Sequence, residues 1–157
     1  MLKLTADFSV DDEVLHQLPL ERLVTYERVD STNSEAMRLL RQGQACPFLV
    51  LASQQTDGRG RRGRRWESPP GAGLYYTLAL EVDRDTQNIA ALSLVTALSV
   101  CSALEKLGVN KLKLKWPNDL LGDARKLSGI LLESLKVGDR LYVIIGVGVN
   151  LNLPDSI

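Results

Sequence analysis

The sequence predicts an α+β fold, with a mixed, mostly antiparallel sheet backed by one short and one long helix. Several segments alternate apolar and polar residues or form short apolar runs, as strands do. Residues 89–107, by contrast, contain neither glycine nor proline and are rich in alanine, leucine, serine and valine, as a buried helix is. With 157 residues, 45% of them hydrophobic, we expect one domain over 1–157 with a core of its own.

The first half of the chain carries signals for one helix and two strands. Thr32 with Glu35 three residues later has the form of a capping box, and Gly43 follows as a stop signal, so a short helix is expected between them. A short apolar run predicts a strand over 47–55. Within 74–82 the larger apolar residues fall at alternate positions, which predicts a strand with one buried face.

The second half predicts the long helix and three more strands. We expect that helix to be buried over much of its surface. Residues 111–116 alternate lysine with apolar residues, which predicts a strand with one basic face, and Pro117-Asn118-Asp119 breaks it. Two further strands, 126–135 and 141–151, are expected to form a hairpin through 137–140.

The most informative segment is Gly-Arg-Gly-Arg-Arg-Gly-Arg-Arg-Trp at 58–66, within a loop over 56–70 that we call the Arg-Gly loop. Five of the chain's 19 lysines and arginines fall in eight consecutive positions, although the formal net charge is zero. Such a cluster repels itself unless an anion lies against it. Trp66 adds a flat surface suited to stacking. The segment therefore predicts an anion-binding loop.

Gly58, Gly60 and Gly63 also match the dinucleotide-binding pattern G-x-G-x-x-G. That pattern requires a helix at its end, and Pro69-Pro70-Gly71 prevents one here. The phosphate-loop pattern fails as well, because no Gly-Lys-Ser/Thr occurs. Both nucleotide-binding folds are therefore excluded.

Composition excludes several other classes of protein. Cys46 and Cys101 are isolated and His16 is the only histidine, so we expect neither a protein-bound metal nor a histidine base. The isoelectric point near 6.6 argues against a general nucleic-acid binder. No long apolar run predicts a membrane span, and the N-terminus lacks a signal peptide, so a cytoplasmic location is expected.

Two lysines mark a second candidate site. Lys115 ends one predicted strand, and Lys126 begins the next. If these strands pair, both ammonium groups lie at one mouth and favour an anion between them. The alternative is a lysine-bearing face that only meets solvent.

Two more segments have a structural and a functional interpretation. Asp30-Ser31-Thr32-Asn33 is a helix N-terminus, which either only begins a helix or also holds a polar ligand. Residues 146–150 are a strand thinned by two glycines, which would let a ligand approach that face. Asn150 could then donate to a ring of that ligand.

Taken in order, these motifs resemble those of biotin protein ligases. The match runs from about residue 26 to 153 with the family's spacing. The motifs are Asp30-Ser31-Thr32-Asn33, Gln55-x-x-Gly58-Arg59-Gly60-Arg61-x-Gly63-Arg64-x-Trp66, Lys115-Trp116-Pro117-Asn118-Asp119, Arg125-Lys126-Leu127-x-Gly129-Ile130-Leu131-x-Glu133 and Gly146-x-Gly148-x-Asn150. The resemblance implies the catalytic fold shared by class II aminoacyl-tRNA synthetases and biotin ligases.

The resemblance also sets an expectation for domain content. Only 29 residues precede the Asp30 motif, too few for the winged-helix domain of some relatives. Family members continue beyond the Asn150 motif with more of the catalytic domain and a small β-barrel. We therefore expect 1–157 to be a catalytic domain that is incomplete at its C-terminal end, with no DNA as a partner.

The implied chemistry is a two-step acyl transfer. Biotin and MgATP give biotinyl-5′-AMP and pyrophosphate, and a lysine of a carboxylase's biotin carboxyl carrier domain then accepts biotin. Such a displacement needs positioned reactants and charge stabilisation rather than a protein nucleophile. A site of arginine and lysine suits it.

The family's residue roles carry over by position. Lys126 and Arg61 would be catalytic, at the junction of carboxylate and α-phosphate. Biotin would be bound by Ser31, Thr32, Asn33, Gln55, Gly58, Arg59, Gly60, Arg61, Lys126 and Gly129. ATP would be bound by Arg61, Arg64, Trp66, Lys115, Asn118, Asp119 and Asn150.

Two other classes remain open. One is a related acyltransferase acting on lipoate or octanoate, which the Arg-Gly loop disfavours. The other is a non-enzymatic module, either a nucleic-acid binder using 58–65 or a biotin-binding remnant. A homodimer would form through 141–151 if that strand lies at a sheet edge, and no membrane partner is expected.

Overall fold

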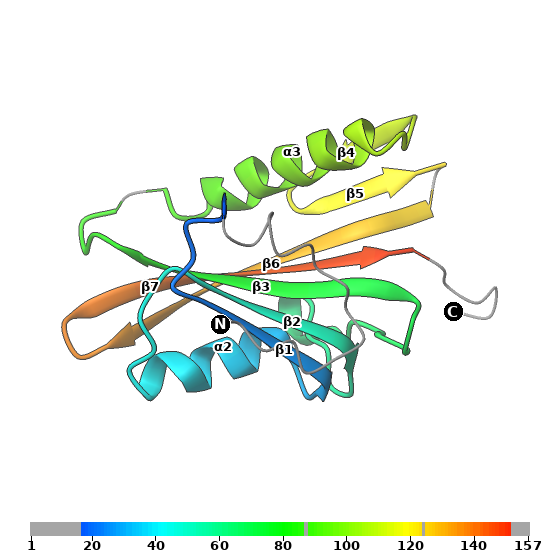
Figure 1. Cartoon of the computed structure of the whole chain (residues 1–157). Helices are drawn as coiled ribbons and strands as arrows, with labels where there is room; N and C mark the ends of the chain where they lie inside the picture. The colour runs from blue at the N-terminus through cyan, green and yellow to red at the C-terminus, as the bar shows by residue number, and fades with distance from the viewer. Residues whose placement is uncertain (1–16, 87, 124, 152–157) are drawn as a thin grey trace.

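The computed structural model describes residues 17–86, 88–123 and 125–151, which form a seven-stranded sheet in the order β1-β2-β3-β7-β6-β5-β4 (Figure 1). β1 is parallel to β2, and all other neighbours are antiparallel, so the predicted mixed, mostly antiparallel sheet is confirmed. The strands are β1 (Arg22–Val29), β2 (Phe48–Gln55), β3 (Gly73–Val82), β4 (Leu112–Lys115), β5 (Asp119–Gly122), β6 (Arg125–Val137) and β7 (Arg140–Asn150). The helices are α2 (Thr32–Arg41), α3 (Ala91–Lys106) and a short 3-10 helix, η1 (Arg61–Gly63).

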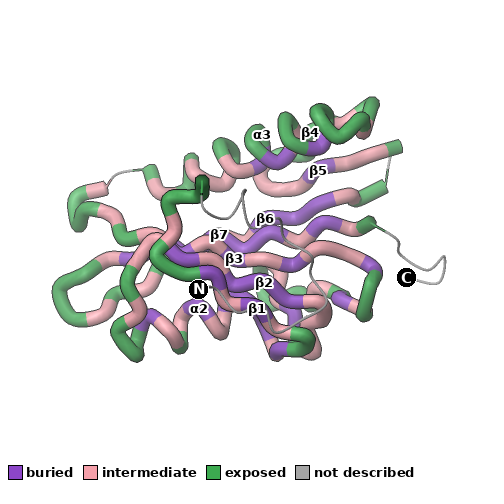
Figure 2. Tube along the Cα trace, viewed as in Figure 1, coloured by how far each residue is buried: buried purple, intermediate pink, exposed green. Residues whose placement is uncertain are grey.

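The short helix α2 and the long helix α3 cover opposite faces of the sheet. On β7, Val143 and Ile145 point into a core beneath α3, while Ile144 points into a second core with Ala36 and Leu40 of α2. This alternation follows from the two-residue period of a strand. The central strands are therefore buried on both sides, and Figure 2 shows the buried residues running along them.

The start of α2 differs from the prediction by one residue. Ser31, not Thr32, is the N-cap: its backbone is extended, and its Oγ accepts from the Ser34 amide at 3.4 Å. The expected capping box was wrong because the Thr32 side chain turns into the sheet, where its hydroxyl donates to Gln55. The predicted end is confirmed, since the helix ends at Arg41 and Gly43 has φ +87°.

Strand β3 is covered on both faces, although the sequence predicted one buried face. The face that carries the smaller side chains Thr77 and Ala79 lies beneath α2, and both of these residues are fully buried. The larger alternate side chains, such as Leu78, are only half-buried on the α3 side. Side-chain size was thus a poor guide to which face of β3 is more buried, because small residues let α2 approach the sheet closely.

Helix α3 is less buried than predicted. Only Ala97, Val100 and Leu104 are buried among its residues, on the face that meets β4, β5 and β6. On the other side Val95 and Leu98 are 55% and 57% exposed. The composition of α3 suggested a buried helix, but composition does not reveal whether one side of a helix or several sides are covered by the rest of the protein.

Two strands were not predicted, and one of them changes the pairing near the lysines. β1 is an edge strand with charged exposed residues, and β5 is only four residues long. β5 lies between β4 and β6, so the strands of Lys115 and Lys126 do not pair directly as expected. The predicted hairpin is confirmed, with its turn at Gly138-Asp139.

The proposed route to a homodimer was wrong. β7 lies between β3 and β6, so its backbone is paired on both sides. The strands at the ends of the described sheet are β1 and β4.

Candidate functional site

A pocket of about 320 Å³ opens on the α2 face of the sheet, beneath the Arg-Gly loop. Most of the sequence-predicted site residues meet here, although they come from α2, β2, the loop, β4, β5 and β6. Those that line it are Ser31, Thr32, Asn33, Gln55, Arg59, Gly60, Arg61, Arg64, Trp66, Lys115, Asn118, Asp119, Lys126 and Gly129. Gly58 and Asn150 do not.

Gln55 holds the start of α2 at one end of the pocket. Its Oε1 accepts from the Thr32 amide at 2.8 Å and from the Thr32 hydroxyl at 3.1 Å. Its Nε2 donates to Ser68 Oγ at 2.9 Å, just beyond the Arg-Gly segment. Both ends of the Gln55 amide are therefore bonded to the protein, and Gln55 fixes the pocket wall. The Ser31 hydroxyl, which accepts as the N-cap, keeps its proton to donate.

Asn33 is held at both ends as well. Its Oδ1 accepts from the Thr77 hydroxyl at 2.6 Å, and its Nδ2 donates to Glu133 Oε2 at 2.9 Å. A Cβ at Gly146 would collide with the Asn33 amide, so a glycine is required there. No role was predicted for Thr77 or Glu133, although Glu133 ends one of the sequence motifs named above.

The Arg-Gly loop folds into a small hairpin. Arg59 and Arg65 form a β-bridge, and the Gly60 amide donates to the Arg64 carbonyl at 2.7 Å. At its base the Trp66 amide donates to the Gly58 carbonyl at 2.8 Å. A Cβ at Gly58 would collide with the Trp66 carbonyl, so Gly58 shapes the loop instead of lining the pocket.

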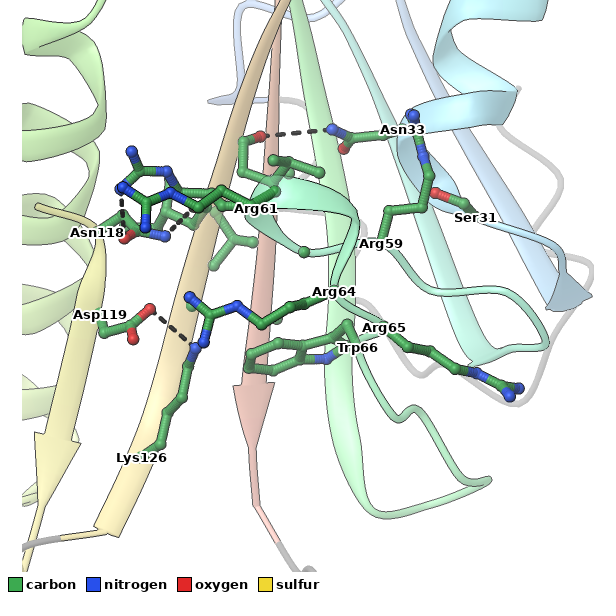
Figure 3. A pocket seen from close by; sticks show the side chains of 18 of the residues that line it. Ser31, Asn33, Arg59, Arg61, Arg64, Arg65, Trp66, Asn118, Asp119 and Lys126 are labelled. Carbon is green, nitrogen blue, oxygen red and sulfur yellow. Dashed lines mark hydrogen bonds and ion pairs between the residues drawn. The ribbon is translucent and has the colours of Figure 1, made fainter.

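The loop's arginines point in different directions (Figure 3). Arg59 pairs with Glu133 at 2.7 Å, and Arg61 donates to Asn118 Oδ1 at 3.0 Å. Arg64 extends toward Asp119 and Lys126 and has no ion pair among the described residues. The Arg65 side chain turns away from the other labelled arginines and donates to the Thr56 carbonyl at 2.9 Å, although the residue still lines the pocket. The cluster thus supplies separate cations along the pocket.

Trp66 lies flat on the glycines of β6 and β7. A Cβ at Gly129 or Gly148 would come within 2.6 Å or 2.5 Å of the indole ring. Gly146 and Gly148 lie on the same face of β7. Asn33 and Trp66 fill the space beside them, where a ligand was expected. The indole is half-buried, and Lys126 Nζ lies 5.0 Å from its ring centroid, within reach of a cation–π interaction.

Lys126 is placed by two contacts near the mouth. Its Nζ lies 2.9 Å from Asp119 Oδ1, and its carbonyl accepts from Asn150 Nδ2 at 3.0 Å. Asn150 thus braces the start of β6 from outside the pocket. Asn118 closes the same corner, because its Nδ2 donates to the Ile130 carbonyl at 2.8 Å.

Arginine and lysine side chains line the pocket, so it can hold an anion. The part of the chain that the structure describes contains no cluster of three or more histidine, cysteine, aspartate or glutamate residues suited to a metal. Burial raises the pKa of the Cys46 thiol to about 11, which does not suggest a nucleophile.

No helix among the described residues is long and apolar enough to cross a membrane.

Residues 25–150 match the family model described as the biotin/lipoate A/B protein ligase family. The chain belongs to this family. Among curated relatives of this ligase family, the bifunctional ligase/repressor BirA of Escherichia coli is 39% identical over 143 residues, covering 88% of this chain and 43% of the relative. The biotin–[acetyl-CoA-carboxylase] ligase of Paracoccus denitrificans is 43% identical over 133 residues, covering 82% and 55%.

Among solved structures of the family, the biotin protein ligase of Aquifex aeolicus in complex with biotin and ATP has a TM-score of 0.70 and 38% identity, covering 87% of this chain and 56% of that one. The expected catalytic fold is thereby confirmed. The chain spans about half the length of the curated ligases it matches.

Proposed function

We propose that the chain carries the biotin-activating site of a biotin protein ligase. The proposed reaction joins biotin to ATP as biotinyl-5′-AMP and then transfers biotin to a lysine of a biotin carboxyl carrier domain. The observation that carries the proposal is the pocket itself, in which the N-terminus of α2, the Arg-Gly loop and Lys126 line one cavity.

The biotin ring would lie at the α2 end of the pocket. Ser31 offers a hydroxyl proton there, while Asn33 and Gln55 hold the surrounding wall through their bonded amides. A preformed polar end with fixed donors gives orientation at low entropic cost. The biotin carboxylate would then point toward Arg59 and Arg61, with Gly60 and Gly129 allowing close approach of the backbone.

The nucleotide would occupy the other end, near the mouth. Arg64 and Lys115 lie there as cations for the phosphates, and Asn118 and Asp119 form the far wall. Trp66 offers its half-buried indole as a stacking surface for the adenine. Asn150 contributes indirectly, through the Lys126 carbonyl.

Lys126 and Arg61 would act on the bond that forms. The carboxylate oxygen of biotin attacks the α-phosphorus, and pyrophosphate leaves. Negative charge shifts between these groups as the bond forms, and cations already in place stabilise that transition state. Asp119 holds Lys126 at this point beforehand.

Magnesium would arrive with the nucleotide and neutralise part of the phosphate charge. Mg²⁺ prefers oxygen ligands and is commonly bound by one or two carboxylates plus phosphates. The side-chain oxygens of Asp119 and Asn118 are of that type and lie at the phosphate end. These two residues would face the ion.

The first experiment measures binding and the first reaction step separately. A thermal-shift titration with biotin, lipoate and single-stranded DNA is expected to give a rise in melting temperature with biotin alone, because a ligand that binds the native state stabilises it. Biotin-dependent exchange of pyrophosphate into ATP then tests adenylate formation. A shift with lipoate, or with DNA, in place of biotin would replace the proposal by one of the alternative classes.

The second experiment tests the acceptor. Transfer of biotin to a carrier domain is expected, and a carrier domain whose acceptor lysine is changed to arginine serves as the control. Exchange without transfer to any carrier domain would limit the proposal to biotin activation.

A further inference from the structure

One carboxylate oxygen joins the Arg-Gly loop to the start of α2. Glu133 Oε2 accepts from Arg59 Nη2 at 2.7 Å and from Asn33 Nδ2 at 2.9 Å. Arg59 belongs to the loop, Asn33 to α2 and Glu133 to the middle of β6. Glu133 therefore contacts the two segments that would enclose a ligand from opposite sides.

The contact is strong enough to matter and shared between its donors. A guanidinium–carboxylate hydrogen bond is charge-assisted, and the two side chains are only 36% and 25% exposed. Because Asn33 and Arg59 share a single acceptor atom, a shift of either changes the geometry available to the other.

Arg59 is not fully satisfied by this contact. Its Nε is buried and has no hydrogen-bond partner within the described residues. A buried N–H without an acceptor is unfavourable, so an acceptor supplied by a ligand would favour the arrangement that buries Arg59. Arg59 lines the pocket, where such an acceptor would lie.

We propose that Glu133 is a positioning residue, which couples occupancy of the α2 end of the pocket to closure of the Arg-Gly loop through Arg59. A ligand packed against the wall beside Asn33 keeps that amide, and with it the Asn33–Glu133 contact, in place, and Glu133 in turn holds Arg59. The inference rests on the proposed function, because biotin is the ligand that it invokes.

The test is tryptic cleavage within residues 59–65, with and without saturating biotin. The ratio of the two rates gives the protection of the loop. In the parent protein biotin is expected to protect. Glu133→Gln keeps an oxygen for Asn33 but loses the charge that holds Arg59, so protection is expected to fall roughly two- to fivefold, the scale of one partly exposed ion pair.

A matched control separates positioning from stability. Glu81→Gln removes another carboxylate of the same sheet, one that pairs with Arg140 at 3.7 Å, remote from the pocket lining. Its protection is expected to equal that of the parent. A purely structural role for Glu133 would lower the melting temperature and leave the protection ratio unchanged, and that result would overturn the inference.

A second variant approaches the same contact from the loop. Arg59→Gln leaves β6 intact and is expected to lose as much protection as Glu133→Gln, with cleavage compared at the sites from Arg61 to Arg65 that all variants keep. The double variant is expected to lose little more, because both changes remove one interaction. Additive losses would overturn the inference.

Failure of the proposed function gives a different result. If biotin raises the melting temperature of the parent but does not protect the loop, the coupling is overturned and biotin binding stands. If biotin does neither, the proposed function fails, and the rates without ligand decide on Glu133 alone. Faster cleavage of Glu133→Gln than of both parent and control supports the Arg59 contact, whereas equal rates overturn it.

Discussion

The ammonium of Lys126 lies 2.9 Å from the carboxylate of Asp119, so the proposed catalytic cation has a partner before any substrate arrives. The pair depends on β5, because this strand brings Asp119 beside Gly129 of β6. An anionic ligand must either displace the Asp119 carboxylate from Lys126 or bind the same ammonium beside it. The contact therefore holds Lys126 at the pocket, and a bound phosphate competes with Asp119 for its ammonium.

Changing Lys126→Gln is expected to abolish most biotin-dependent pyrophosphate exchange while leaving the fold intact. The Lys126 side chain is 44% exposed and Asp119 is 20% exposed, and the glutamine amide can still donate to the carboxylate that loses its ion pair. Removing one pre-placed donor of a developing charge lowers the rate roughly 100- to 1000-fold. The control is Lys136→Gln on the same strand, outside the pocket lining. Exchange above about a tenth of the parent rate would make Lys115 the better candidate.

Changing Gly148→Ala is expected to displace Trp66 and weaken nucleotide binding. The new Cβ would lie 2.5 Å from the indole, so the ring must move. Loss of a stacking surface for a base costs about 1–3 kcal/mol, which is roughly five- to 150-fold in affinity.

Gly122→Ala is the control for this change, because its Cβ would make ordinary van der Waals contacts, with Leu127 at 3.4 Å and Leu112 at 3.7 Å. Tryptophan fluorescence should change in Gly148→Ala and stay constant in the control. An unchanged ATP affinity in a Gly148→Ala protein with altered fluorescence would argue that Trp66 serves the core and not the nucleotide.

Changing Thr77→Val is expected to destabilise the protein and loosen the α2 end of the pocket. The hydroxyl is completely buried and donates to Asn33 Oδ1, with Thr32 Oγ1 also within 2.8 Å. A valine of the same shape leaves these acceptors without their donor, at about 1–3 kcal/mol. Thr96→Val on α3 removes a hydroxyl bonded only within its own helix and is the control. Urea unfolding and biotin titration measure the two effects, and equal values for both variants would contradict the role.

Changing Asp30→Asn is expected to reduce stability at neutral pH but not in acid. Hydrogen bonds from Arg38 lower the pKa of the Asp30 carboxyl below its ordinary 3.8. A lowered pKa stabilises the fold above the unfolded value, and this contribution is lost as the pH falls through the lowered pKa. Because both side chains are more than 40% exposed, we expect about 0.5–1 kcal/mol at pH 7.

The measurement is urea unfolding of parent and variant at several pH values. The two curves should differ at pH 7 and converge below pH 3.8. Asp139→Asn removes a carboxylate that pairs with Arg84 but is 90% exposed, and should change stability little. A constant difference between parent and Asp30→Asn across the range would mean that the carboxylate's charge contributes nothing.

The sequence predicted those features whose cause is local. The turn at Gly138-Asp139 is a two-residue connection with a glycine at positive φ, and its residues alone indicate it. The gathering of cations was also predictable, because the arginines of the loop are adjacent in the chain. The family resemblance then brought Lys126 and Ser31 to the same site.

Features that depend on distant partners were not predictable. Thr77 has no local sign of its role, since its partners Asn33 and Thr32 lie 44 and 45 residues away. The four residues of β5 gain their conformation from β4 and β6 on either side. Sequence also indicated room beside Gly146 and Gly148 without revealing that side chains of the protein occupy it.

The place of β7 in the sheet has a consequence for how the chain is made. It is the last of the described strands to be synthesised, yet it joins β1-β2-β3 on one side to β6-β5-β4 on the other. Until β7 inserts, a nascent chain holds two three-stranded halves with no common strand. Asn33 belongs to the first half, and its hydrogen-bond partner Glu133, 100 residues later in the chain, lies on β6 in the second. A chain cut at the Gly138-Asp139 turn should therefore lack the site, and a separate peptide of residues 140–150 should restore it by completing the sheet.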